Sequence, residues 1–149
     1  MSRIYVALDL ETTGFSPDRD MILEIGAVKF RIPPDPADDP IIDRWTTLIN
    51  PGRSIPYRIT RLTGIADSDV ARAPRLAHVL DELRAFIGNY PVVGHNVAFE
   101  LSFLQRHGIL VGQATLDTFE LASVLLPEAT RYSLGELARH LGMEFTGWH

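Results

Sequence analysis

The sequence contains no cysteine, which excludes disulfide bonds and thiolate metal sites. No apolar run approaches the ~20 residues that a membrane-spanning helix requires. The first residues, MSRIYVALDLETTG, lack the apolar stretch and the cleavage site of a signal peptide. Repeats and low-complexity tracts are also absent from the sequence. We therefore expect one cytoplasmic domain over residues 1–149 that makes no contact with a membrane.

The chain is also short of basic residues. It carries 14 Lys and Arg against 19 Asp and Glu, which gives a formal net charge of −5. Proteins that coat nucleic acid through bulk electrostatics are strongly basic, so the charge argues against that class. It remains compatible with an enzyme that holds one chain end in a small acidic cleft where metal binds. The hydrophobic content of 46% is enough for a core and too high for a disordered chain.

The first third of the chain reads as three strands. Apolar and β-branched runs predict strands over residues 4–9, 21–30 and 41–49. Residues 31–40 (RIPPDPADDP) contain four prolines and three aspartates, which predicts an exposed connection between the second and third strands. Consecutive strands with short connections favour an antiparallel meander.

The second half alternates between helix and strand patterns. The expected elements are a helix over residues 77–87, a strand over 91–94, a helix over 98–106, a strand over 116–117, and helices over 119–125 and 134–141. Asn96 is a suitable N-cap for the helix at 98. Ser133 suits the helix at 134, with Glu136 completing a capping box. We predict an α/β fold whose mixed sheet is antiparallel over three strands and then parallel, with helices on its faces. Ligands of such sheets bind at the carboxyl ends of the parallel strands, near Asp9 and His95.

Two acids at the end of the first strand are candidate metal ligands. Asp9 closes an apolar run, and Glu11 lies two residues further on, so both side chains can point to one side of a strand. Carboxylates forced together repel, and a divalent cation relieves that repulsion. Oxygen ligands without cysteine favour Mg²⁺ or Mn²⁺. The alternative is an ordinary acid at a strand end followed by an acid in a turn.

The next four residues are candidate substrate contacts. Thr12, Thr13 and Gly14 supply hydroxyls, backbone N–H groups and a flexible turn that can approach a phosphate closely. Phe15 then places an aromatic ring where it can stack on a base. The alternative is an ordinary turn followed by a core phenylalanine.

Five segments, in this order along the chain, resemble motifs of the DnaQ-like (DEDD) 3′–5′ exonuclease family. They are residues 9–14 (DLETTG), 24–27 (EIGA), 62–65 (LTGI), 93–104 (VGHNVAFELSFL) and 132–138 (YSLGELA). The first segment resembles the first exonuclease motif, the third a nucleotide-contacting turn, the fourth the second motif, and the fifth the approach to the third motif. The matches span nearly the whole chain and are most similar to the DEDDh branch.

The resemblance implies a ribonuclease H-like fold and hydrolysis with two divalent cations, Mg²⁺ or Mn²⁺. It assigns Asp9 to both ions, and Glu11 to one ion and to orientation of the water. Glu100 stands where the family more often has the shorter aspartate. We expect Glu100 to bind metal directly or through water, with altered geometry. The alternative for Glu100 is a solvated acid on a helix.

The resemblance also implies substrate contacts. Leu62 and Thr63 belong to the nucleotide-contacting turn, and Asn96 meets the nucleotide in addition to capping its helix. His95 is either a structural histidine or a substrate contact, and we favour the structural role. Phe99 is a core residue first and a weaker candidate for contact with the substrate.

The family's third motif has a histidine as general base, followed by an aspartate as the last metal ligand. By position, His149 resembles that histidine, and the ordinary pKa of a histidine suits proton transfer from water. On this interpretation the domain is truncated at its C-terminal end and lacks the C-terminal helix with the last carboxylate. This chain would then be inactive by itself. The alternative is that His149 is merely a terminal residue.

The expected activity is therefore 3′–5′ exonuclease action on single-stranded DNA or RNA, with a nucleoside monophosphate as product. The expected partner is a polymerase that the domain proofreads, or a fused DinG-type helicase. The alternative is a catalytically inactive module of the same fold that binds nucleic acid or a partner. Glu100 and the missing last carboxylate favour the module, whereas Asp9 and Glu11 favour the enzyme.

Overall fold

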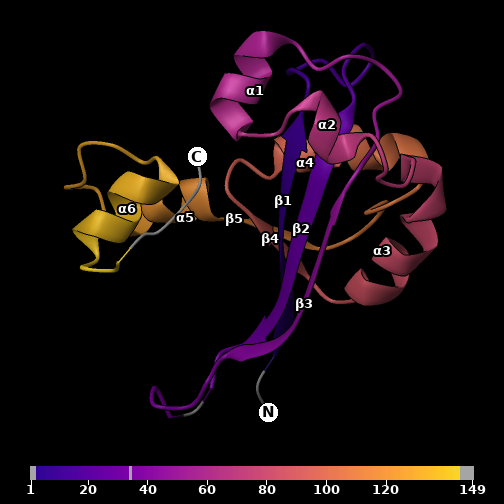
Figure 1. Ribbon diagram of the computed structural model, residues 1–149. Coiled ribbons are helices and arrows are strands. Elements are labelled where there is room, and N and C mark those ends of the chain that lie inside the picture. Colours follow the sequence, from indigo (N-terminus) through magenta and orange to yellow (C-terminus); the bar gives the residue numbers. More distant parts are fainter. Residues whose placement is uncertain (1–2, 34, 145–149) are drawn as a thin grey trace.

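The computed structural model describes residues 3–33 and 35–144. Within these ranges the chain forms a mixed five-stranded sheet with strand order β3-β2-β1-β4-β5, flanked by helices (Figure 1). The strands are β1 (Ile4–Thr12), β2 (Ile22–Arg31), β3 (Ile41–Leu48), β4 (Val92–Gly94) and β5 (Thr115–Asp117). The predicted α/β class and the predicted strands are confirmed.

The strands β1, β2 and β3 form the predicted antiparallel meander. In β1 the buried side chains of Val6, Leu8 and Leu10 alternate with more exposed ones, as expected for a strand with one face on a core. The described residues of the proline-rich connection between β2 and β3 are largely exposed, as predicted. Figure 1 shows this hairpin projecting away from the helices.

The strands β4 and β5 run parallel to β1, also as predicted. The pairing of β1 with β4 joins Val6 to Val92 and Ala7 to Val93. The strand β1 continues beyond this pairing to Thr12, whereas β4 ends at Gly94. The last residues of β1 therefore extend past β4 at the carboxyl end of the parallel pair, which is where ligands bind in such sheets.

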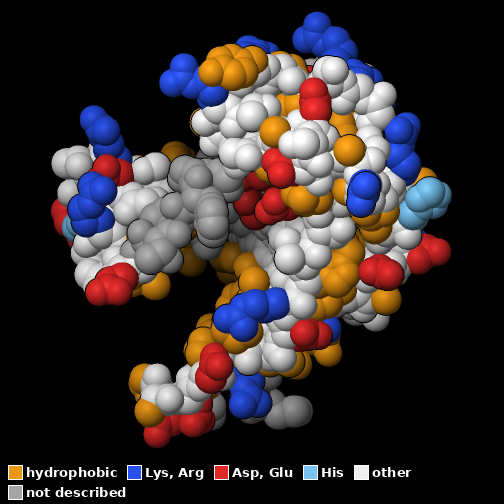
Figure 2. Space-filling view, in the orientation of Figure 1, with side chains coloured by type: hydrophobic (Ala, Val, Ile, Leu, Met, Phe, Trp, Pro, Cys, Tyr) orange, Lys and Arg blue, Asp and Glu red, His pale blue; other side chains and the backbone are white. Residues whose placement is uncertain are grey.

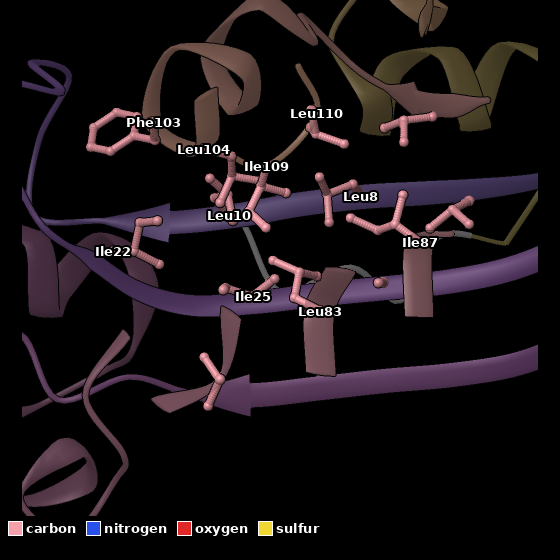
Figure 3. Close-up of a cluster of buried hydrophobic side chains, with 14 of the residues drawn as sticks. Leu8, Leu10, Ile22, Ile25, Leu83, Ile87, Phe103, Leu104, Ile109 and Leu110 are labelled. Atoms are coloured by element: carbon pink, nitrogen blue, oxygen red, sulfur yellow. The ribbon is translucent and has the colours of Figure 1, made fainter. Parts of the chain in front are cut away.

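The main core lies between the sheet and two helices, α3 (Leu80–Ile87) and α4 (Ala98–Leu104). Figure 3 shows Leu10 of β1 beside Leu104 of α4, and Ile25 of β2 beside Leu83 of α3. Leu83 and Leu104 are fully buried, which stabilises the fold by about 2 kcal/mol for each side chain. This packing fixes the position of α4 relative to the end of β1.

A second, smaller core holds two short helices, α1 (Tyr57–Thr63) and α2 (Asp67–Val70), around Leu23 of β2. The sequence interpretation did not predict either helix. The helix α1 begins after Pro56 without a side-chain cap, and only Ile59 and Thr63 of its residues are buried. Neither an N-cap signal nor a long apolar stripe marks such a segment in the sequence.

The remaining helices are η1 (Leu76–His78), η2 (Gln105–His107), α5 (Thr118–Leu125) and α6 (Leu134–His140). Figure 1 shows α5 and α6 together at one side of the sheet, next to β5. No residue of α5 is buried, whereas α6 buries Leu137 and Ala138. Among the described residues, no helix has both the length and the apolar character needed to cross a bilayer.

The predicted helix caps are only partly correct. Ser133 is the N-cap residue of α6, but its side chain makes no capping hydrogen bond. The prediction that Asn96 caps the helix at 98 is wrong, because the N-cap position of α4 belongs to Val97. Asn96 adopts a left-handed backbone with φ of 62°, which asparagine tolerates better than most residues.

Candidate functional site

The end of β1 presents two acidic side chains on one side of the sheet. Leu10 and Thr12 are buried, whereas Asp9 is exposed and Glu11 is half-buried. Because strand side chains alternate, Asp9 and Glu11 point to the side opposite Leu10, as their spacing predicts. Figure 2 shows acidic side chains gathered over the course of β1.

Glu100 lies in the first turn of α4, where its side chain interacts with Asp9 and with the main chain of Leu10 in β1. Its side chain is buried, with 3% exposure, and no described residue forms a hydrogen bond with Oε2. Burial raises the pKa of Glu100 to about 8. That net value includes smaller effects: hydrogen bonds to the main chain of Glu100 itself and of Leu10 lower the pKa, and the charges of Asp9 and Asp117 raise it. The carboxyl group is therefore largely protonated at neutral pH.

The three predicted metal ligands do not form a ready-made metal cluster. Within the described ranges, no group of three or more acids or histidines is arranged to hold an ion. Repulsion between like charges opposes a close cluster of carboxylates in a protein without bound metal. The donor chemistry nevertheless fits a divalent cation. Glu100 places an oxygen without a hydrogen-bond partner next to the charge of Asp9, and buried carboxylates normally pair with a cation.

The loop after β1 is organised around Asp20, a residue that the sequence interpretation did not single out. Asp20 Oδ1 accepts a hydrogen bond from the hydroxyl of Thr13 at 3.1 Å, and Oδ2 accepts one from the N–H of Ser16 at 2.9 Å. The Thr13 hydroxyl in turn accepts one from the N–H of Met21 at 2.9 Å. One carboxylate thus closes the loop. No sequence pattern marks it, because its partners lie four and seven residues away.

The predicted contacts Thr12, Thr13 and Gly14 are all buried in this loop. The Thr12 hydroxyl donates to the carbonyl of Gly14 at 2.5 Å, and that of Thr13 donates to Asp20. Both hydroxyl hydrogens therefore stabilise the loop itself. Direct contact of these hydroxyls with a phosphate stays a prediction.

Two arginines hold the outer side of the same loop. Arg106 donates a hydrogen bond to the carbonyl of Pro17 and forms an ion pair with Asp18 at 3.1 Å. Arg53 donates to the carbonyl of Arg19 at 2.8 Å. The loop is thus bonded from within by Asp20 and from outside by two arginines.

A pocket of about 380 Å³ lies between this loop, α1 and α4. It brings together several of the residues predicted from the sequence. They are Glu11, Thr12, Gly14, Phe15, Leu62, Thr63 and Phe99. Phe15 is 87% exposed at the pocket and meets Phe99 edge-on, with 6.3 Å between the ring centroids. Arg58 also lines the pocket and was missed, because a single arginine in a short helix forms no motif.

His95 and Asn96 lie apart from this pocket. The Nδ1 atom of His95 is 2.9 Å from the Thr118 hydroxyl, and Nε2 is 2.7 Å from the carbonyl oxygen of Tyr132. A carbonyl only accepts, so Nε2 carries a hydrogen. Both ring nitrogens are thus engaged in linking β4 to α5 and to the segment before α6, which agrees with the structural role that the sequence favoured.

Asp117 is a further residue that the sequence interpretation did not assign. Its carboxylate accepts hydrogen bonds from the N–H groups of Asn96 at 3.0 Å and Val97 at 3.2 Å. It also caps α5 by accepting from the N–H of Phe119 at 2.8 Å. This one side chain joins the starts of two helices. His149 lies outside the described residues, so its predicted role as general base stays a prediction.

Residues 6–149 match the RNase_T family, described as Exonuclease. The chain belongs to this exonuclease family, and the resemblance noted in the sequence is confirmed. Members of the family typically use divalent metal ions.

Several curated relatives are named as DNA polymerase III proteins. The DNA polymerase III PolC-type protein of Clostridium perfringens (strain 13 / Type A) is 38% identical over 149 residues, covering 97% of this chain and 10% of that protein. The DNA polymerase III subunit epsilon of Aquifex aeolicus (strain VF5) is 33% identical over 150 residues, covering 97% of this chain and 71% of that protein. The chain thus spans about a tenth of the length of the PolC-type relatives that it matches.

Solved structures show the same fold. The structure of exonuclease X in complex with 5′ overhanging duplex DNA has a TM-score of 0.71 and 23% identity, covering 97% of this chain and 79% of that one. The zinc ion bound form of the E. coli exonuclease I complex with single-stranded DNA has a TM-score of 0.74 and 16% identity, covering 97% and 36%. The ribonuclease H-like fold predicted from the sequence is therefore confirmed.

Proposed function

We propose that this domain removes nucleotides from the 3′ end of single-stranded DNA by hydrolysing the terminal phosphodiester bond, with two Mg²⁺ or Mn²⁺ ions. The observation that carries the proposal is the buried Glu100 carboxyl group, whose Oε2 atom has no hydrogen-bond partner among the described residues and which lies beside Asp9. A folded core gains nothing from such a group, because burying a polar atom without a partner costs about 1–3 kcal/mol. A cation that binds there removes this cost.

In this proposal Asp9, Glu11 and Glu100 hold the ions through carboxylate oxygens. Divalent cations held by these carboxylates would supply hydroxide from water and stabilise the leaving oxygen. Glu11 lines the pocket, where its carboxylate would orient the attacking water. Glu100 would give up its proton on becoming a ligand, so metal binding would release protons near neutral pH.

The pocket beside these acids receives the terminal nucleotide. Phe15, Leu62 and Phe99 offer apolar surface for the base, and the tightly bonded loop holds Phe15 in place. The curated relatives act in DNA polymerase III by name, which favours a polymerase rather than a helicase as the partner of this domain and DNA rather than RNA as the substrate. The product is a nucleoside monophosphate.

The test follows single-stranded oligonucleotides labelled at the 3′ or the 5′ end, with Mg²⁺, with Mn²⁺ and with EDTA. We expect early loss of the 3′ label, a ladder of shortened 5′-labelled strands, and no reaction in EDTA. Asp9→Ala abolishes the reaction, whereas Asp35→Ala, an exposed aspartate in the β2–β3 hairpin, leaves it unchanged. Calorimetric titration with Mn²⁺ gives an independent readout, because Asp9→Ala and Glu100→Ala should each weaken metal binding.

The second candidate is a binding module without catalysis. The absence of a preformed cluster of three acids among the described residues favours it, as does glutamate rather than aspartate at position 100. This module would retain a labelled single strand without shortening it in either metal. A wild-type protein that is folded, binds the strand and leaves both labels intact would establish this second function and overturn the first.

A further inference from the structure

The pocket that would receive the strand belongs to an acidic protein, and the strand is itself negatively charged. The chain has a formal net charge of −5, and Glu11 lines the pocket within reach of a strand that carries a negative charge at each phosphate. Metal ions held at the carboxylates would offset the charge of the phosphate at the linkage that is cut. The rest of the strand needs a cation from the protein.

The helix α1 turns one face to this pocket. Its residues at the pocket are Arg58, Ile59, Leu62 and Thr63, which recur with the spacing of a helix face. Ile59 and Thr63 are buried and anchor the helix, whereas Arg58 and Leu62 are exposed. Arg61 is exposed as well but is not among the residues that line the pocket.

Arg58 is the only cationic residue among the described residues that line this pocket. The ion pairs of the described part of the chain that involve an arginine engage Arg84, Arg106 and Arg139. Arg58 takes part in none of these ion pairs. Figure 2 shows basic side chains at the end of the molecule where Figure 1 places α1, beside an exposed hydrophobic side chain.

We propose that Arg58 binds a backbone phosphate of the single strand at a linkage other than the one that is cut. This inference rests on the proposed function and adds a specific contact to it. The guanidinium group offers planar, bidentate hydrogen bonds to phosphate oxygens. The neighbouring Leu62 and Phe15 provide the apolar wall for the base. Arg58 thereby holds the strand in register, while the carboxylates and their metal ions act at the terminal linkage.

The first experiment measures the affinity of the full chain for a single strand by fluorescence anisotropy, in Mg²⁺ and over a range of salt concentrations. A phosphorothioate at the 3′ end prevents cutting during the measurement. Arg58→Ala should raise Kd roughly tenfold or more and lower the salt slope of log Kd by about 0.7. Arg58→Lys should restore the slope. Arg61→Ala, the same charge change on the same helix, should alter the slope less.

The second experiment locates the contact. Uncharged methylphosphonate linkages are placed one at a time along the strand, and Kd is measured for wild type and Arg58→Ala. At one linkage other than the terminal one, the methylphosphonate should weaken binding of the strand to wild type. At that linkage it should not weaken binding to Arg58→Ala. Coupling confined to the terminal linkage overturns the proposal. The proposal is also overturned if Arg58→Ala raises Kd no more than Arg61→Ala does, because overall charge then explains the weaker binding.

Failure of the proposed function and failure of the inference about Arg58 give different results in these experiments. If wild type neither shortens nor binds single strands, the function itself is wrong and Arg58 has no phosphate to bind. If wild type shortens strands and Arg58→Ala behaves identically, the inference about Arg58 alone fails. Because Arg58 is exposed, the thermal midpoint of its variants should stay at the wild-type value, which excludes misfolding as the cause of weak binding.

Discussion

The buried carboxyl group of Glu100 makes the stability of the metal-free protein depend on pH. Burial raises the pKa of Glu100 from 4.5 to about 8. Between these two values the folded protein keeps a proton that the unfolded chain has lost, so the free energy of unfolding falls as pH rises from 4.5 to about 8. The loss is on the order of a few kcal/mol.

Glu100→Gln keeps the shape of the protonated side chain and has no proton to lose. In EDTA we expect the variant to match wild type near pH 4 and to exceed it in thermal midpoint at pH 8. Its Mn²⁺ affinity should fall, because an amide is a poorer ligand than a carboxylate. Glu120→Gln, the same change at an exposed glutamate, is the control. Equal pH profiles for wild type and Glu100→Gln would show that Glu100 titrates normally.

The carboxylate of Asp20 leaves no room for a side chain at position 14. A Cβ atom at position 14 would lie 2.5–2.7 Å from the carboxylate atoms of Asp20, which is closer than packing allows. Asp20 cannot easily move away, because it holds Thr13 and Ser16. Gly14→Ala should therefore lower stability by about 1–3 kcal/mol and weaken strand binding. Gly26→Ala in β2, where nothing lies within 4 Å of the added atom, should have a smaller effect on both.

At the scale of the elements, Asp117 connects β5 to the starts of α4 and α5. Asp117→Ala removes the acceptor of three backbone N–H groups, those of Asn96, Val97 and Phe119. Loss of a cap costs about 1 kcal/mol, and the half-buried position of Asp117 limits the total to about 1–3 kcal/mol. Chemical denaturation measures this loss. Glu120→Ala, an acid in the same first turn of α5, should cost less than half as much.

The strands could be predicted from the sequence because their patterns are local. Alternation in β1 and the proline-rich segment after β2 are visible within about ten residues, and they gave the meander and its exposed connection correctly. Asp9 and Glu11 share a side of β1 for the same local reason.

The short helices and the long-range partners could not be predicted in this way. The helix α1 has no side-chain cap and only two buried residues, so the sequence around Leu62 read as a turn. Asn96 resembles an N-cap locally, but the acceptor at α4 is Asp117, which pairing of β4 with β5 brings there. Arg58 and Asp20 gain their roles only once the chain has folded around the pocket and the loop.

At the scale of the whole molecule, the charge predicts that metal controls access of the substrate. A protein with a formal net charge of −5 repels a single strand, and the acids over β1 add to this repulsion where the strand must bind. Strand affinity should therefore be weak in EDTA and rise severalfold with Mg²⁺, with both effects decreasing as salt increases.

The distribution of the charge, rather than its sum, should decide this behaviour. A variant that combines Asp9→Asn, Glu11→Gln and Glu100→Gln should bind a phosphorothioate-ended strand more tightly than wild type in EDTA, and gain little from Mg²⁺. The matched control changes three exposed aspartates of the β2–β3 hairpin, Asp35, Asp38 and Asp39, to asparagine. Both variants have three fewer acids, so the formal net charge of each changes from −5 to −2. Because Glu100 is already largely protonated without metal, the β1 variant loses less charge in EDTA than the hairpin variant, so tighter binding by the β1 variant would not come from overall charge. If both triple variants bind equally well in EDTA and respond equally to Mg²⁺, overall charge governs binding and the carboxylates at β1 are not the metal site. If the hairpin variant keeps the wild-type response to Mg²⁺ and the β1 variant loses it, the ions act at the end of β1.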